Sequence, residues 1–91
     1  MDGEQTQAPL VTGFSHVGLA VNDVERMVDI LRAFGYEVVA RKQIVGQGTS
    51  RIMRSGTSAF DLLDPNVADG RLARFVQHRG PGLHHVCVEV S

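Results

Sequence analysis

The chain is built from short runs in which apolar and polar residues alternate, and most runs end at a glycine or a proline. This pattern is typical of strands that bury one face. Residues 14–21, FSHVGLAV, are the first such run. One face carries large apolar residues, Val17, Leu19 and Val21, and the other carries His16, Gly18 and Ala20. The run therefore predicts a strand with an apolar face and an opposite face of small residues plus one histidine.

The next segment changes to the helical period. Apolar residues recur at positions 24, 27, 28, 31 and 34, which places them on one side of a helix. Asn22 is the expected N-cap, and Glu25 stands three residues later, as in a capping box. Gly35 follows the last apolar position, where a glycine commonly ends a helix.

The remaining pattern completes an α+β domain. We expect strands at 36–44, 50–54, 57–64 and 83–90 and a second helix at 70–79, which gives the order βαβββαβ. Residues 1–12 show no period and are assigned to a flexible leader, so that the folded module comprises residues 13–91.

The first and last strands resemble each other. HVGLAV begins at His16 and HVCVEV begins at His85, 69 residues later, which indicates two copies of one module with the second copy ending after its first strand. In the last strand, alternation groups His84 with the valines at 86 and 88, whereas His85 shares the opposite face with Cys87 and Glu89.

Three side chains that face away from the apolar surface are candidate metal ligands. They are His16, His85 and Asp61, the last of which stands opposite Phe60 and Leu62 in its strand. Two neutral imidazoles and one carboxylate suit a divalent ion such as cobalt, zinc, nickel, manganese or iron, with binding that weakens at acid pH. Taken on spacing alone, two distant histidines and a solvated aspartate are the competing interpretation.

Composition excludes several classes of protein. The formal net charge is −1, so no positive field attracts nucleic acid or an acidic membrane. The apolar runs are too short for a transmembrane helix, and the polar N-terminus does not resemble a signal peptide. Cys87 is the only cysteine, which rules out an internal disulfide. These features favour a cytoplasmic protein.

Three longer stretches together resemble a known family. FSHVGLAVNDVERMVDILRAFGYEVV, SAFDLLDP and GRLARFVQHRGPGLHHVCVEV are similar to the N-terminal part of methylmalonyl-CoA epimerases in the vicinal-oxygen-chelate (glyoxalase) superfamily. The resemblance covers residues 14–91. It implies a βαβββ glyoxalase-type module followed by a helix and the first strand of a second, missing module. It also implies one divalent metal held by His16, Asp61 and His85, with no counterpart in this chain for the family's fourth ligand.

The resemblance is imperfect at positions that matter for activity. Asp61 is one methylene shorter than the Gln or Glu that the family has there. Arg51 stands where the family's epimerases carry a glutamate base on the third strand, and arginine stays protonated and cannot act as a base. The second acid-base glutamate belongs to the missing module, so no catalytic base is assigned.

Three further residues are candidates for binding the substrate. In the family the sheet forms an open cup around the metal, and the resemblance implies that Arg51 faces this cup and holds a carboxylate or phosphate. The competing interpretation is a solvated arginine on a short strand. Cys87 and Glu89 share the face of His85. The competing interpretations are a small semi-buried filler for Cys87 and an exposed strand-end residue for Glu89.

These observations lead to two hypotheses on function. In the first, the protein is an epimerase-like isomerase or a lyase, or the N-terminal part of one, and acts on an acyl thioester of coenzyme A or a carrier protein. In the second, it is a non-catalytic protein of the antibiotic-sequestering type, which the arginine at position 51 favours. Because the last strand lacks the rest of its module, we also expect a homo-oligomer, with a dimer as the simplest form.

Overall fold

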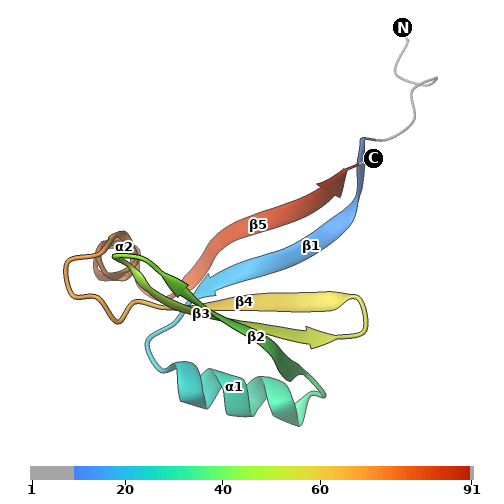
Figure 1. Cartoon of the computed structure of the whole chain (residues 1–91), viewed down its shortest axis with the longest axis horizontal. Coiled ribbons are helices and arrows are strands. Elements are labelled where there is room, and N and C mark those ends of the chain that lie inside the picture. Colours follow the sequence, from blue (N-terminus) through green and yellow to red (C-terminus); the bar gives the residue numbers. More distant parts are fainter. Residues whose placement is uncertain (1–9, 91) are drawn as a thin grey trace, which may run out of the picture.

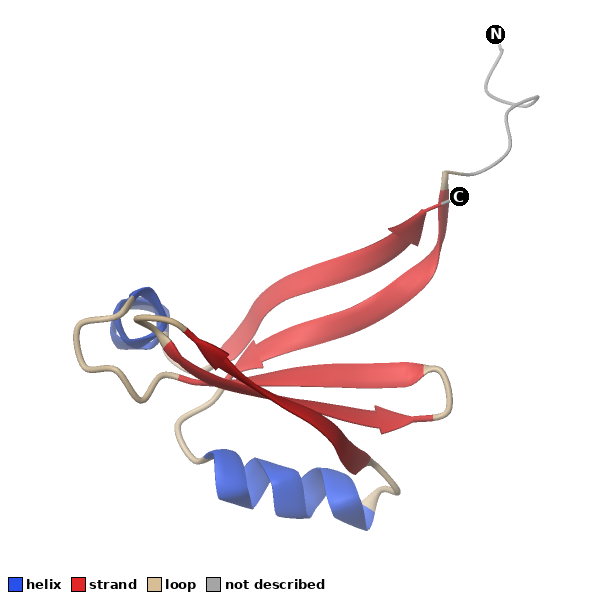
Figure 2. Cartoon of the chain, viewed as in Figure 1, coloured by secondary structure: helices blue, strands red, loops and turns tan. Residues whose placement is uncertain are grey.

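The computed structural model describes residues 10–90 and shows a twisted sheet with two helices (Figures 1 and 2). In chain order the elements are β1 (Val11–Ala20), α1 (Val24–Ala33), β2 (Glu37–Ile44), β3 (Gly48–Ser55), β4 (Ser58–Asp64), α2 (Arg71–Arg79) and β5 (Gly82–Val90). The predicted α+β class and element order are therefore confirmed. β1 begins at Val11, inside the segment that was assigned to the leader, whereas residues 1–9 lie outside the described part.

All five strands belong to one sheet with the order β2-β3-β4-β1-β5. β1 pairs with β4 in parallel and with β5 in antiparallel fashion, so β1 lies between the two strands that carry the other candidate ligands. β2, β3 and β4 form two consecutive antiparallel hairpin pairs. The last strand thus pairs with the first strand of its own chain.

Helix α1 covers one face of the sheet and makes the main core. The helix lies against β2 and β4, as Figure 1 shows below the sheet. Its N-cap is Asp23, whose carboxylate accepts a hydrogen bond from the backbone N–H of Arg26 at 3.1 Å; the predicted cap, Asn22, is one residue too early. The residues buried in this core come from three elements and the loop before α1: Val21, Val24, Val28, Met53 and Leu62.

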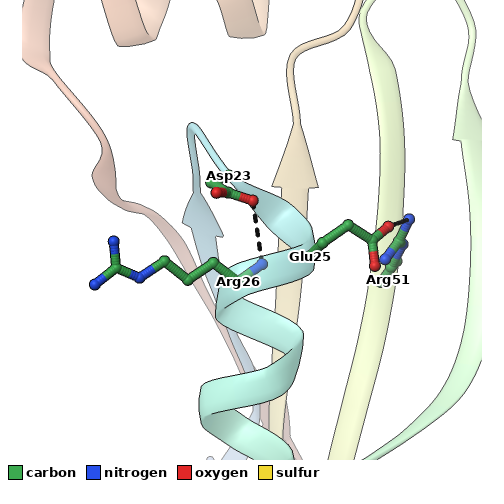
Figure 3. A network of polar contacts seen from close by, with 4 residues as sticks. All are labelled: Asp23, Glu25, Arg26 and Arg51. Atoms are coloured by element: carbon green, nitrogen blue, oxygen red, sulfur yellow. Dashed lines mark hydrogen bonds and ion pairs between the residues drawn. The ribbon is translucent and has the colours of Figure 1, made fainter.

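An ion pair adds a polar contact between α1 and the sheet. The guanidinium of Arg51, on β3, lies 2.6 Å from the carboxylate of Glu25, on the first turn of α1 (Figure 3). The arginine side chain is only 17% exposed, whereas that of the glutamate is 71% exposed. The hydrogen bond from Arg51 lowers the pKa of the Glu25 carboxyl below its ordinary value of 4.5, and the charges of Arg51, Arg41 and Arg32 act in the same direction.

Strand β5 lies at the edge of the sheet, next to β1. Val86 and Val88, which alternation groups on one face of the last strand, are both exposed. Phe14, opposite Val88 on β1, is exposed as well. The β1–β5 ribbon therefore presents an apolar surface, which we call the ribbon face: Phe14, Val86 and Val88. Neither helix in residues 10–90 has the length and apolarity needed to span a membrane.

The Glu25–Arg51 pair predicts a specific pH dependence of stability. A carboxyl whose pKa is lowered by folding stabilises the fold above its unfolded pKa, and this contribution disappears as the pH falls through the folded pKa. We expect Glu25→Gln to lower the melting temperature at pH 7, and the difference from wild type to shrink between pH 5 and 3. Asp29→Asn, on the same helix, is the control because no ion pair of Asp29 is seen in residues 10–90. A difference that stays constant over this pH range would refute the assignment.

Candidate metal centre

The centre is built on one row of residues that crosses three neighbouring strands. Gly18 of β1 is paired with Asp61 of β4 on one side and with His85 of β5 on the other. Paired residues on neighbouring strands project from the same face of a sheet, so the aspartate and the histidine flank the glycine on one surface. A Cβ atom on Gly18 would overlap the imidazole ring of His85. The ring therefore lies in space that is open because Gly18 has no side chain.

The second histidine comes from the same strand as the glycine. His16 lies two residues before Gly18 on β1, and its Nε2 atom is 3.2 Å from Nε2 of His85. The two rings meet edge to face, with an angle of 89° between their planes. One ligand atom from each of His16, Asp61 and His85 lies within 4.8 Å of the other two. The structure thus brings together the three residues that the sequence singled out.

The donor set fits a divalent cation. The Oδ1 atom of Asp61 is buried and has no hydrogen-bond partner among the described residues, an arrangement that costs roughly 1–3 kcal/mol or more for a carboxylate. Two nitrogens bound to one zinc ion at about 2.0–2.1 Å, at an angle of roughly 90–109°, lie about 2.8–3.4 Å apart. The observed 3.2 Å between the Nε2 atoms of His16 and His85 falls within this range. A cation between these three groups would satisfy the carboxylate oxygen as well.

Two irregularities in the β1–β5 pairing orient the histidines. Phe14 pairs with Val88 and His16 with Cys87, so Ser15 is an extra residue on β1. On β5, the pairing passes from His85 directly to the residue at 83, so that His84 is the extra residue there. A β-bulge places two residues opposite one and can re-aim a side chain. Simple alternation missed both bulges, because nothing in the sequence marks them.

The bulge on β5 corrects one expectation. Alternation placed His84 on the opposite face from His85, yet the Nδ1 atoms of the two rings are 2.9 Å apart. The His84 ring also contacts Phe75 of α2 edge to face, with centroids 4.8 Å apart. Burial lowers the pKa of His84 below its ordinary value, and the charge of His85 lowers it further.

Arg51 lies on the other side of the sheet. It pairs with Leu62 of β4, which belongs to the α1 core, and its guanidinium is bound to Glu25. The expectation that Arg51 faces the cup is therefore wrong, because Arg51 projects from the face that α1 covers and its neighbour Ile52 from the face of Asp61. The β3 residues that share the face of Asp61 are Ser50, Ile52 and Arg54, and Ile52 is directly opposite the aspartate. None of these three side chains is a carboxylate.

The two other candidates lie on β5, beside the histidines. Cys87 is paired with His16 and is exposed, which places it at the rim of the centre rather than among the ligand atoms. Glu89 lies further along β5 and, together with His16 and Ser15, lines a hollow of about 520 Å³ where β1 diverges from β4. Figure 1 shows this divergence toward the start of β1 and the end of β5.

Comparisons with known proteins agree with this architecture. The chain is 33% identical to the mitochondrial methylmalonyl-CoA epimerase of Bos taurus over 84 residues, which cover 85% of this chain and 46% of the bovine protein. The structure of methylmalonyl-CoA epimerase from Mycobacterium tuberculosis superposes with a TM-score of 0.78 at 26% identity, covering 99% of this chain and 63% of that one. A Streptomyces coelicolor methylmalonyl-CoA epimerase variant in complex with 2-nitronate-propionyl-CoA gives 0.75 at 27% identity, covering 86% and 61%.

The chain matches only part of each of these relatives. It spans about half the length of the bovine relative and about three-fifths of the two solved structures. A sequence model of the Glyoxalase/Bleomycin resistance protein/Dioxygenase superfamily matches residues 15–91, which include the whole candidate centre. The match to the sequence model, the fold and the similarity to epimerases agree, and the chain therefore belongs to the glyoxalase/bleomycin resistance protein/dioxygenase superfamily.

Proposed function

We propose that the chain forms the metal-binding half of a divalent-metal-dependent epimerase that acts on an acyl thioester of coenzyme A. The observation that carries this proposal is the convergence of His16, Asp61 and His85 on one face of the sheet. The similarity to methylmalonyl-CoA epimerases supports the type of substrate. When bound, the ion would supply positive charge that stabilises the negative charge developing on a thioester as its α-proton leaves.

The chain's own residues have separate roles in this proposal. His16 and His85 supply uncharged nitrogen ligands, and Asp61 supplies the one negative charge of the set. The hollow has room for the acyl group, and Ser15, His16 and Glu89 are polar residues that line its β1–β5 side. Cys87, which pairs with His16 and is exposed, would contact a bound substrate at the rim.

Few residues of this chain could act as the base that removes the α-proton. The β3 residues on the face of Asp61 include no carboxylate, and Arg51 is directed toward α1. Glu89 is the remaining acidic residue that lines the hollow. This deficit favours the second candidate function, a protein that binds its ligand on the metal face without chemistry.

Hydrogen exchange distinguishes the two candidates. With Co²⁺ added in heavy water, we expect the protein to replace the α-hydrogen of methylmalonyl-CoA by deuterium roughly 100-fold or more faster than the metal alone. Mass spectrometry follows the exchange. His16→Ala should abolish it, and His78→Ala, which changes an exposed histidine on α2, should not. Saturable binding of methylmalonyl-CoA without exchange would establish the non-catalytic function instead.

Gly18 gives a test of the metal centre that leaves all ligands in place. In Gly18→Ala the new methyl group displaces the His85 ring. Because this ring is the far end of a side chain that can rotate, the fold should change little. We expect zinc affinity to fall by about 10–100-fold, measured by chelator competition, with a nearly unchanged melting temperature. Gly13→Ala is the matched control on β1, because its Cβ would meet only Glu89 Oε1, at 3.6 Å. Equal zinc affinities in the two variants would count against the site.

The ribbon face supports the proposal that two copies of the chain associate. β5 is an edge strand, and Phe14 on its neighbour is 68% exposed; such apolar edges favour association. We expect a dimer in sedimentation velocity at micromolar concentration, and its conversion to monomer in Phe14→Lys. The control is Val39→Lys, since Val39 is 56% exposed but lies on β2, away from the ribbon. A wild-type protein that sediments as a monomer would end this proposal.

A further inference from the structure

Each of the two candidate ligand histidines follows a bulge residue that contacts its ring. Ser15 is the extra residue of β1, and its Oγ atom is 3.2 Å from Nδ1 of His16. His84 is the extra residue of β5, and its Nδ1 atom is 2.9 Å from Nδ1 of His85. In both pairs the contact uses Nδ1, while the Nε2 atoms of His16 and His85 are directed at each other.

The position of the bulges explains how neighbouring residues make these contacts. Phe14 and Val17 are three residues apart, yet they pair with Val88 and Val86, which are two apart and share one face. Two residues of β1, Ser15 and His16, therefore fit into the interval that one residue of a regular strand would occupy. The extra residue turns each bulge side chain toward the histidine that follows it.

We propose that Ser15 and His84 are positioning residues that set the tautomers of His16 and His85. In this arrangement, which rests on the metal centre proposed above, Nδ1–H of His16 donates to Ser15 Oγ and Nδ1–H of His85 donates to His84 Nδ1. A neutral imidazole carries one hydrogen, so Nε2 of each ligand histidine is left with its lone pair free. Both lone pairs then face the point between His16, Asp61 and His85.

The geometry accounts for the contact between the two ligand rings. If both Nδ1 atoms carry the hydrogens, the Nε2 atoms at 3.2 Å have no hydrogen between them, and their lone pairs oppose each other. A cation between the two rings would remove the repulsion between these lone pairs. The same cation would contact the buried carboxylate oxygen of Asp61, which has no hydrogen-bond partner among the described residues. Hydrogen-bond partners behind ligand histidines fix ring orientation and raise ligand basicity, and their loss costs about 10–100-fold in metal affinity.

His84 is itself held in place from outside the sheet. Its ring packs edge to face on Phe75 of α2, and the guanidinium carbon of Arg79 lies 5.9 Å from the centre of the same Phe75 ring. The second helix thus reaches the centre through Phe75 and His84, although none of its own side chains is among the ligands. This gives the HH pair on β5 two different roles, with His85 as ligand and His84 as its support.

The test combines zinc affinity with a direct reading of the tautomers. Zinc binding is measured by chelator competition for His84→Ala and Ser15→Ala, and for the conservative variants His84→Gln and Ser15→Thr, which keep a hydrogen-bond acceptor. His78→Ala is the control, as an exposed histidine on α2. We expect about 10–100-fold weaker zinc binding for each alanine variant, and recovery of most of the affinity in the conservative variants.

Nitrogen-15 NMR of the zinc-loaded wild-type protein gives an answer that does not depend on any variant folding. We expect hydrogens on Nδ1 of His16 and His85 and zinc on both Nε2 atoms. Zinc on Nδ1 of either ring, or alanine variants that bind zinc within about twofold of wild type, would overturn the inference. Asp61→Ala separates the two proposals: if it loses affinity while the Ser15 and His84 variants do not, only the tautomer inference fails. If Asp61→Ala also binds zinc as wild type does, the metal centre itself fails.

Discussion

The centre depends on the pairing register of β4, β1 and β5, which sets Asp61, Gly18 and His85 in one row across the sheet. Neighbouring strands are about 4.8 Å apart, so the two outer side chains of the row can meet only above the middle residue. A glycine in the middle leaves that space open for the His85 ring. A shift of one residue in either pairing would send a ligand to the opposite face. Register and the absent side chain thus create the site together.

The hydrophobic core and the candidate metal centre lie on opposite faces of the sheet. On one face, α1 packs on Met53 and Leu62, and the Arg51–Glu25 ion pair lies on the same side. On the other face are the two histidines and the aspartate, whose Oδ1 atom has no hydrogen-bond partner in the described part of the chain. This division explains why an arginine at position 51 does not disturb the centre, since its charge is compensated by the helix. The β3 residues that share the face of these candidate ligands include no carboxylate.

Much of this arrangement could be predicted from the sequence, because it follows from periodicity. Alternation in the first strand separated His16 from the apolar face, and the same rule picked out Asp61 on the fourth strand. The rule failed where the strands are irregular. The bulge at His84 brings this side chain next to His85, and no residue type announces it. Arg51 differs for another reason, because the family resemblance suggests its role, whereas the pairing with Leu62 decides the face on which it lies.

The central claim is that one divalent ion binds to side chains from β1, β4 and β5. X-ray absorption spectroscopy of the protein with one equivalent of Co²⁺ tests it most directly, because this method identifies the atoms around the ion. The account predicts a first shell with two imidazole nitrogens and a carboxylate oxygen, and the loss of one imidazole signal in His85→Ala. A shell of water oxygens alone, or a spectrum unchanged in His85→Ala, would contradict it.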